Sequence, residues 1–282
     1  MSEIYDNRAC QLGEGPLWHP LRNQLFWFDI NGKRLHCDDG QTWQFDEHVS
    51  AAGWINATEF LVASETALLR FDIESGAKSE ICSLEADDPE TRSNDGRADP
   101  WGGFWIGTMH KEAANAGGAI YRFYEGELRQ LFAPISITNA IAFAPDRSRA
   151  YWADTAAQKV FRTALDAQGW PTSAPTVFLD LVEDDLNPDG SIVAADGSYL
   201  NAQWGASRVA RYDATGAFLD AYDFPTSHIT CPALGGPNLS TLFATSAQQG
   251  MDDAQLTREP DAGKTFSLET SIKGLPEYQV KL

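Results

Sequence analysis

The chain has 282 residues, and its 40 acidic and 21 basic side chains give a formal net charge of −19 at pH 7. Hydrophobic residues make up 43% of the chain and charged residues 22%, which is typical of a folded globular protein rather than of a disordered chain or a fibre. Its strong negative charge argues against nucleic acid and anionic membranes as partners, because both would repel it.

Targeting signals are absent from the sequence as read. The first ten residues, MSEIYDNRAC, have no basic start followed by an apolar run, so no secretory signal is expected. No stretch approaches the roughly 20 apolar residues that a membrane span requires. The four cysteines, at positions 10, 37, 82 and 231, are irregularly spaced. We therefore expect buried free thiols in a cytoplasmic protein, rather than a disulfide framework or a zinc site.

Short strand-like runs recur along the chain, while helical periodicity is almost absent. The runs start at successive steps of 34, 44, 46, 49 and 43 residues. They are Phe26–Ile30, Phe60–Ser64, Phe104–Thr108, Ala150–Asp154, Tyr199–Gln203 and Leu242–Ser246. A second strand-like stretch and a polar turn follow each of the first five runs.

A repeat of about 40 to 50 residues with four short strands is typical of a β-propeller blade. Six copies span nearly the whole chain, so we predict an all-β fold in which residues 1–282 form a single six-bladed β-propeller domain. Closing such a ring hides the exposed edges of its sheets. We expect the first strand-like residues, about Ile4 to Cys10, to pair with Glu277–Leu282 in one blade and so close the ring.

The repeats also allow equivalent positions in different blades to be compared. We call the positions ten to twelve residues before the runs the ruler positions. Ten to twelve residues before five of the runs stands one small or polar residue: Glu14, Asn94, Asn139, Asp189 and Cys231, and the second repeat offers only Ser50. Equivalent positions in successive blades lie at equivalent places around the axis, so we expect these side chains to converge. Two carboxylates and two amides would meet there, with no Lys or Arg at these positions.

The alternative explanation for each residue alone is a turn, since Asn and Asp are common where strands begin. The shared register and the neighbouring glycines favour a site instead. Converging carboxylates repel each other and lose solvation unless a cation joins them. Oxygen ligands suit Ca²⁺, Mg²⁺, Mn²⁺ or hydrated Zn²⁺, so we predict one divalent cation without choosing among them.

Four motifs along the chain resemble the SMP-30/gluconolactonase/LRE family. They are LGEGPLW (12–18), RSNDGRADPWGGFWIGTM (92–109), ITNAIAFAPD (137–146) and NPDGS (187–191), with ITCPALGG (229–236) as a weaker fifth. The resemblance implies a six-bladed propeller with one axial divalent metal. It also implies hydrolysis of sugar-acid lactones, so that the partner is a small sugar lactone.

The resemblance also implies roles for single residues. Glu14, Asn139 and Asp189 match the three metal ligands, and the substrate-binding positions of the family are matched by Arg92, Asn94 and Glu112. Ala140 stands where the ITNG pattern is commoner, and we expect it to change the turn but not the ligand.

A lactone is a cyclic ester, and a divalent cation can polarise its carbonyl and activate water. Asp189, on the PDG turn, is the candidate to accept the proton of that water. Two other functions stay open on the same fold: a metal-dependent aryl esterase or phosphotriesterase, and a calcium-binding propeller without enzymatic activity. The sugar, the ring size, the metal and the oligomeric state are also open.

Other polar and aromatic residues near the motifs have simpler explanations. We expect His110 and His228 to be rim or turn residues, and Asp95 and Asp99 to accept hydrogen bonds in turns. His19, His36 and His48 show no ligand spacing. Packing explains Trp18, Trp101 and Trp204 better than a wall for a sugar ring.

Overall fold

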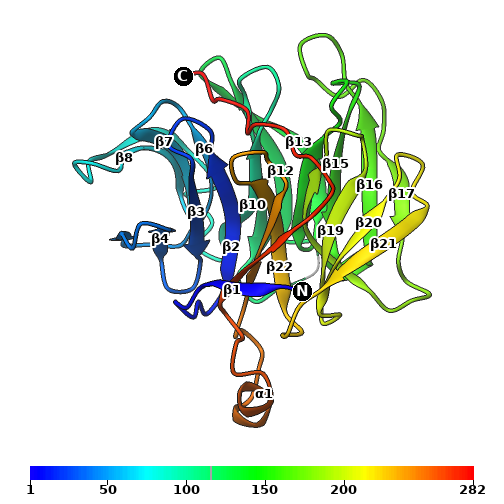
Figure 1. Ribbon diagram of the computed structural model, residues 1–282. Helices are drawn as coiled ribbons and strands as arrows, with labels where there is room; N and C mark the ends of the chain where they lie inside the picture. The colour runs from blue at the N-terminus through cyan, green and yellow to red at the C-terminus, as the bar shows by residue number, and fades with distance from the viewer. Residues whose placement is uncertain (115) are drawn as a thin grey trace.

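The structure is a computed structural model that describes residues 1–114 and 116–282. Six four-stranded antiparallel sheets are arranged as the blades of a propeller around one axis (Figure 1). In the first five blades the strands follow chain order from the axis to the rim. This confirms the predicted six-bladed β-propeller.

Blades one to three use twelve consecutive strands. These are β2 (Gly13–His19), β3 (Gln24–Asp29), β4 (Arg34–Cys37), β5 (Thr42–Gln44), β6 (Val49–Trp54), β7 (Glu59–Ser64), β8 (Ala67–Asp72), β9 (Lys78–Ser83), β10 (Thr91–Ala98), β11 (Phe104–His110), β12 (Gly118–Tyr124) and β13 (Glu127–Ile135).

Blades four to six contain the remaining strands. These are β14 (Thr138–Phe143), β15 (Arg149–Asp154), β16 (Lys159–Ala164), β17 (Thr176–Asp180), β18 (Asn187–Val193), β19 (Tyr199–Trp204), β20 (Arg208–Tyr212), β21 (Phe218–Asp223), β22 (Ile229–Gly235), β23 (Thr241–Ser246), β24 (Thr265–Glu269) and β1 (Glu3–Asp6). A 3₁₀ turn, η1 (Thr155–Ala157), follows β15, and the short helix α1 (Asp253–Arg258) lies between β23 and β24.

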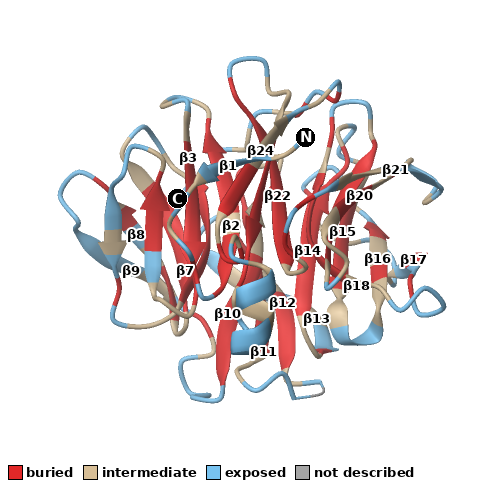
Figure 2. Ribbon diagram, turned by 60° about the horizontal axis from the view of Figure 1, so that its bottom comes forward, coloured by how far each residue is buried: buried red, intermediate tan, exposed pale blue. Residues whose placement is uncertain are grey.

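The repeated apolar runs form the second strand of each blade. These strands are buried along almost their whole length, because each blade packs face to face against its two neighbours (Figure 2). Strands covered on both faces read as near-continuous apolar runs rather than as an alternating pattern. The outermost strands β9 and β21 are largely exposed, so the core lies between the blades and not along their rims.

Ring closure differs from the prediction at one of its two partners. β1 completes blade six by pairing with β24, with Glu3 opposite Ser267. Glu277–Leu282 forms no strand, so its predicted pairing with the N-terminal segment is wrong. The excursion that carries α1 delays the third strand of blade six, so that β24 occupies the place beside β1.

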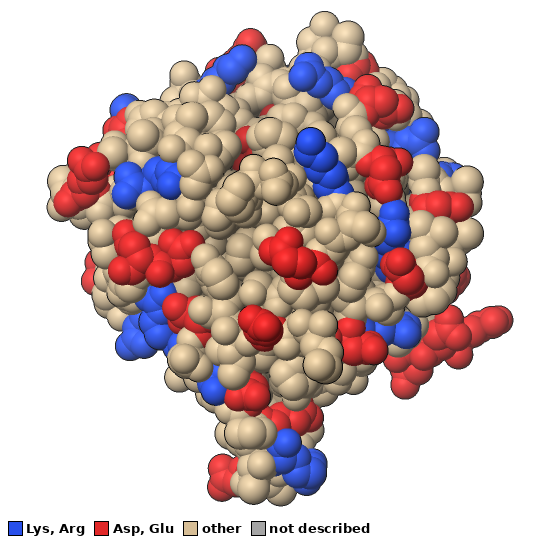
Figure 3. Space-filling view, in the orientation of Figure 1, with Lys and Arg blue, Asp and Glu red and all other residues tan. Residues whose placement is uncertain are grey.

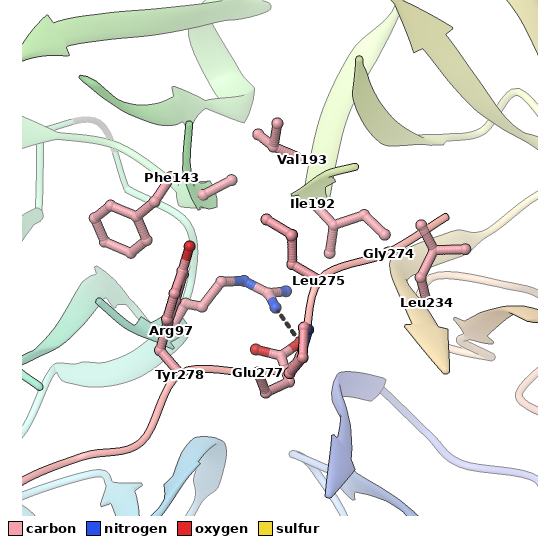
Figure 4. A pocket seen from close by; sticks show the side chains of 11 residues that line it. Arg97, Phe143, Ile192, Val193, Leu234, Gly274, Leu275, Glu277 and Tyr278 are labelled. Atoms are coloured by element: carbon pink, nitrogen blue, oxygen red, sulfur yellow. Dashed lines mark hydrogen bonds and ion pairs between the residues drawn. The ribbon is translucent and has the colours of Figure 1, made fainter. Parts of the chain in front are cut away.

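The C-terminal segment instead crosses one end of the axis, on the face opposite α1 (Figure 1). The backbone N–H of Val280 donates to the carbonyl of Trp54, and that of Lys281 donates to the carbonyl of Gly102, both at 2.9 Å. Glu277 accepts from Arg97 at 2.7 Å, and Figure 4 shows the two side chains meeting at the closed end. The C-terminal segment, called the tail below, therefore supplies the carboxylate of Glu277 as the partner of the Arg97 guanidinium in the middle of the ring.

The cysteines agree with the expectation of free thiols. All four cysteines are free thiols, with Cys82 half-buried and the others buried. On the face shown in Figure 3, basic side chains are interspersed with acidic ones. In the part of the chain that the structure describes, no helix has the length and apolar character needed to cross a membrane.

The ion pair at the closed end predicts a stability effect. Glu277→Ala removes the partner of the Arg97 guanidinium, whose side chain is only 13% exposed, so we expect the free energy of unfolding to fall by about 2–4 kcal/mol. Urea unfolding followed by tryptophan fluorescence measures this. Glu183→Ala, on an exposed loop, is the matched control and should change stability by less than about 0.5 kcal/mol. Equal stability of the two variants would contradict the structural role of the pair.

Candidate functional site

A pocket of about 740 Å³ lies where the inner strands of several blades converge. Glu14 comes from β2, Arg92 and Asn94 from β10, Asn139 from β14 and Asp189 from β18. All five side chains line the pocket and each belongs to a buried residue. The structure therefore brings together all the predicted metal ligands and, with Glu112 at the rim of the same pocket, all three predicted substrate contacts.

Interruptions of the strand ladder turn these residues toward the axis. The pairing of each inner strand shifts where the marked residue stands, for example between Glu14 and Leu17 and between Asn139 and Ala142. A bulge of this kind bends a strand and redirects its side chains. Gly15 and Ala140 both have positive φ, 54° and 61°. Asn139 lines the pocket, as expected, but the structure does not show the change of turn that was expected from Ala140: the alanine adopts the left-handed conformation that a glycine favours.

A glycine in the fifth blade permits close packing beneath the site. A Cβ at Gly190 would lie 2.3 Å from the Cys231 sulfur, closer than real Cβ contacts allow. Cys231 thus packs behind Asp189 from the next blade and does not line the pocket. Ser50 is also absent from the pocket lining, since its hydroxyl donates to Ser93 at 2.8 Å. Two of the six positions found by the repeat ruler are therefore packing positions.

Two carboxyl groups meet at the floor of the pocket. Burial raises the pKa of Glu14, and the charge of Asp95 raises it further. The pKa of Asp189 is raised well above its ordinary value by burial and by the charge of Glu14. Both shifts have the same cause: two negative charges share a small space with little water.

Asp95 is a third buried carboxylate near this pair. Its Oδ2 accepts from the backbone N–H of Ile141, on β14 of the next blade, at 2.6 Å. Burial raises the pKa of Asp95, while Arg97 and the backbone donors oppose that effect. The predicted role as an acceptor within a turn is therefore wrong: Asp95 lies in β10, connects two blades and adds negative potential to the floor of the site.

A chain of hydrogen bonds orients the two amides. Arg92 donates to Asn94 Oδ1 at 2.7 Å, and Asn94 Nδ2 donates to Asn139 Oδ1 at 3.1 Å. Asn139 Nδ2 donates to the hydroxyl of Thr155 at 2.9 Å. Since the amide nitrogens are used in this way, the amide oxygens are turned inward, and each keeps a lone pair for another partner.

Two cations do line the pocket, although none occupies the ruler positions. Burial lowers the pKa of the Arg92 guanidinium to about 10, against the opposite effect of the Glu14, Glu65 and Asp189 charges. Lys111 stands at the rim, where its ammonium group contacts Glu65. The carboxyl pair is thus only partly balanced by the protein itself.

The remaining predicted residues are scattered around the mouth. Glu112 lines the pocket as an exposed residue. Trp204 also lines it and stacks on His228, with ring centroids 4.0 Å apart, whereas Trp18 and Trp101 pack elsewhere. His110 accepts from the backbone of Glu112, as expected for a turn residue.

A second ring of pocket residues was missed from the sequence. Its members lie two positions before the axial residues in five of the six blades: Leu12, His48, Arg92, Ile137 and Asn187. Since side chains two apart on a strand share a face, the same ruler moved by two residues would have found this ring. Among its members, the sequence had drawn attention only to Arg92.

Residues 12–248 match the SMP-30/gluconolactonase/LRE-like region. The chain belongs to this family. It is 36% identical over 276 residues to the L-arabinolactonase of Azospirillum brasilense, covering 94% of this chain and 90% of that protein. It is 34% identical over 284 residues to pentonolactonase XacC of Haloferax volcanii, covering 96% and 95%.

A solved member of the SMP-30/gluconolactonase/LRE-like family has almost the same fold. Regucalcin from Agrobacterium tumefaciens, described as a calcium-binding protein, superposes with a TM-score of 0.98 at 36% identity. The match covers 100% of this chain and 98% of that one. The family resemblance expected from the motifs is therefore confirmed.

The donor set of this family member fits a hard divalent cation. Two carboxyls with raised pKa values and an inward amide oxygen are oxygen ligands whose repulsion a cation would relieve. Among residues 1–114 and 116–282 no group of three His, Cys, Asp or Glu side chains gathers as a metal site. The predicted set contains only two such residues, because its third member is Asn139.

The raised pKa values predict how the stability of the metal-free protein depends on pH. The folded state retains a proton on Glu14 up to about pH 8, whereas an unfolded glutamate releases it near 4.5. Stability from this group is therefore complete at low pH and is lost as pH rises toward about 8. Glu14→Gln removes that loss. In the presence of a chelator, the free energy of unfolding of the variant should therefore rise relative to that of wild type, by about 1–3 kcal/mol between pH 5 and pH 8.

Saturating Ca²⁺ or Mn²⁺ should then stabilise wild type more than Glu14→Gln, because the variant lacks a carboxylate for the cation. Denaturant unfolding at several pH values, with chelator or metal, gives both quantities. A constant difference between the two proteins across this range would show that Glu14 does not hold the proton.

Proposed function

We propose that this protein is a sugar lactonase: a hydrolase that uses a divalent cation and opens the lactone of an aldonic or aldaric acid by attack of water. The observation that carries the proposal is the pair of buried carboxyls, Glu14 and Asp189, beside oriented amides at the floor of a pocket in a chain of this family. Relatives named for the hydrolysis of arabinolactone and pentonolactone support the substrate class.

Glu14, Asn139 and Asp189 would hold the cation, which would supply a Lewis acid for the carbonyl and for water. Hydrogen bonds already orient two of these three side chains. Thr155 accepts from the amide of Asn139, and the N–H of Gly15 donates to Glu14 Oε2 at 2.8 Å. These contacts leave little freedom for the ligands to move, which lowers the cost of ordering them when the ion binds.

Asp189 is the group that would take the proton from the attacking water. Its backbone carbonyl accepts from Asn201 at 3.0 Å, so the turn that carries the carboxyl is anchored from the adjacent strand. Without a cation, burial and the charge of Glu14 raise its pKa. A bound cation would lower that pKa and keep Asp189 ionised, which is the form that a general base needs.

Arg92 and Asn94 would hold hydroxyl or carboxylate oxygens of the substrate. The guanidinium uses Nη1 for the carbonyl of Ser93 and for Asn94 Oδ1, at 2.8 and 2.7 Å. Its other nitrogens stay available to a ligand in the pocket. Glu112 would accept from hydroxyl groups at the rim. This polar lining suits a polyhydroxylated substrate better than the apolar group of an aryl ester or phosphotriester.

Activity is tested with a panel of five- and six-membered aldonolactones and aldarolactones in a pH-indicator assay. Each of Ca²⁺, Mg²⁺, Mn²⁺ and Zn²⁺ is added to chelator-treated protein, and spontaneous opening is subtracted. We expect one proton released per turnover with at least one metal, and almost none for Asp189→Asn at saturating metal. Folded protein that opens no lactone with any metal would overturn the proposal; ester or phosphotriester hydrolysis alone would favour the alternative enzyme.

Arg92 and Asn94 should affect substrate use more than metal content. Arg92→Ala and Asn94→Ala remove contacts to substrate oxygens, so we expect each to lose about 10²–10³-fold in kcat/KM. Metal titration should show that both variants still bind the cation, whereas Asn139→Ala should bind it more weakly. Kinetics like those of wild type in both variants would remove these two residues from the site.

A further inference from the structure

We propose that His48 is a second proton-transfer residue of this site and donates a proton from Nε2 to the ring oxygen of the lactone as the ring opens. The inference rests on the lactonase function proposed above and adds a residue to it. His48 lines the pocket directly before β6, in a blade that provides none of the proposed metal ligands. It occupies the position that Arg92 occupies in the next blade, two residues before the ruler position.

The imidazole is held in one orientation by Glu65. His48 Nδ1 lies 2.5 Å from Glu65 Oε2, and the backbone N–H of Glu65 donates to the carbonyl of His48 at 2.8 Å. Burial acts to raise the pKa of Glu65, but hydrogen bonds from Lys111 and His48 outweigh it and hold that pKa below its ordinary value. An ionised carboxylate only accepts hydrogen bonds, so Nδ1 is the donor.

This orientation reserves the other ring nitrogen for the pocket. Within residues 1–114 and 116–282, Nε2 of His48 has no hydrogen-bond partner, and the side chain is 23% exposed. A histidine whose Nδ1 is fixed by a carboxylate, with Nε2 turned to a cavity, is the arrangement by which imidazole transfers protons in hydrolases. The packing role expected for an unremarkable histidine would not leave this nitrogen free.

Opening an aldonolactone needs such a donor. The leaving group is the alkoxide of a sugar hydroxyl, which is strongly basic and leaves poorly unless it is protonated. Asp189 serves the attacking water, from which it takes a proton, so another group is needed to protonate the leaving oxygen. Of the two cations in the pocket lining, Arg92 holds its proton with a pKa of about 10, and Lys111 is engaged by Glu65 and by the carbonyl of Pro89.

The proton balance closes with the groups named. Water adds to the carbonyl carbon, and its proton goes to Asp189. The tetrahedral carbon then re-forms its carbonyl and breaks its bond to the ring oxygen. That electron pair takes the Nε2 proton of His48, which enters the step as an imidazolium paired with the Glu65 carboxylate and leaves it as a neutral ring protonated on Nδ1. Asp189 and the new carboxyl group lose their protons to solvent, and the imidazole regains one. The net result is an open hydroxy acid and one released proton.

The test uses two substrates that differ in the basicity of the leaving oxygen. A δ-aldonolactone releases an alkoxide, whereas dihydrocoumarin, a six-membered lactone, releases a phenoxide that leaves without a proton. General acid catalysis contributes about 10²–10⁴-fold, so His48→Gln should lose at least about 10²-fold in kcat for the aldonolactone and less than about threefold for dihydrocoumarin. Glu65→Gln, which loosens the ring, should show a smaller loss with the same selectivity.

Three controls separate this inference from other effects. His110→Gln changes a histidine of the same rim outside the pocket lining and should keep wild-type kinetics. Metal titration of His48→Gln should match wild type. Wild-type turnover of the aldonolactone establishes the proposed function first, so failure of that function is seen independently of the variants.

Loss of less than threefold for His48→Gln on the aldonolactone would overturn the inference, and so would equal losses on both lactones. If wild type does not turn over dihydrocoumarin, the solvent deuterium isotope effect on the aldonolactone decides. If His48 transfers a proton, kcat of wild type is lower in D₂O than in H₂O, and this isotope effect is smaller in His48→Gln. An unchanged effect in the variant would show that His48 moves no proton.

Discussion

Six inner strands meet around one axis, and this convergence brings like charges into a small buried volume. Glu14, Asp95 and Asp189 are all buried, and the pKa of each is raised. Like-charged carboxylates without solvent destabilise a fold unless each is protonated, hydrogen-bonded or matched by a cation. Backbone donors, Arg92 and Arg97 supply part of that balance, and the proposed divalent ion would supply the rest.

The charges along the axis alternate from the pocket to its closed end. The carboxyl pair lies above Asp95, Arg97 feels the charge of Asp95, and Glu277 of the tail pairs with Arg97. Arg97 also donates to the carbonyls of Ile141 and Ser191, so it connects the inner strands of three blades. The electrostatics of the pocket floor therefore depend on residues at the opposite end of the molecule.

The fold could be predicted from the sequence because each blade needs one strand that is covered on both faces. Runs such as FLVAS and FWIGT are therefore almost wholly apolar, and their spacing reveals the repeat. The axial residues were found because one bulge recurs at the same point of each inner strand. Both features are local and periodic.

Other parts of the structure depend on contacts between segments that carry no repeat. Nothing local distinguishes the tail from an edge strand, and its path is decided by Trp54, Gly102 and Arg97 from distant blades. His48 looked unexceptional because its partner Glu65 lies in the turn between β7 and β8, and Lys111 belongs to another blade. The ruler also included Cys231 and Ser50, since periodicity marks a position on the axis but not its chemistry.

Closure of the ring through β1 and β24 has a consequence for how the protein is made. Glu3 pairs with Ser267, so the ring stays open during synthesis until nearly the whole chain has left the ribosome. Blade six provides no carboxylate, but it stands between blade five, with Asp189, and blade one, with Glu14. The two acids therefore come together only when the last blade is inserted, and a nascent chain keeps them apart in water until the rest of the molecule can support their burial.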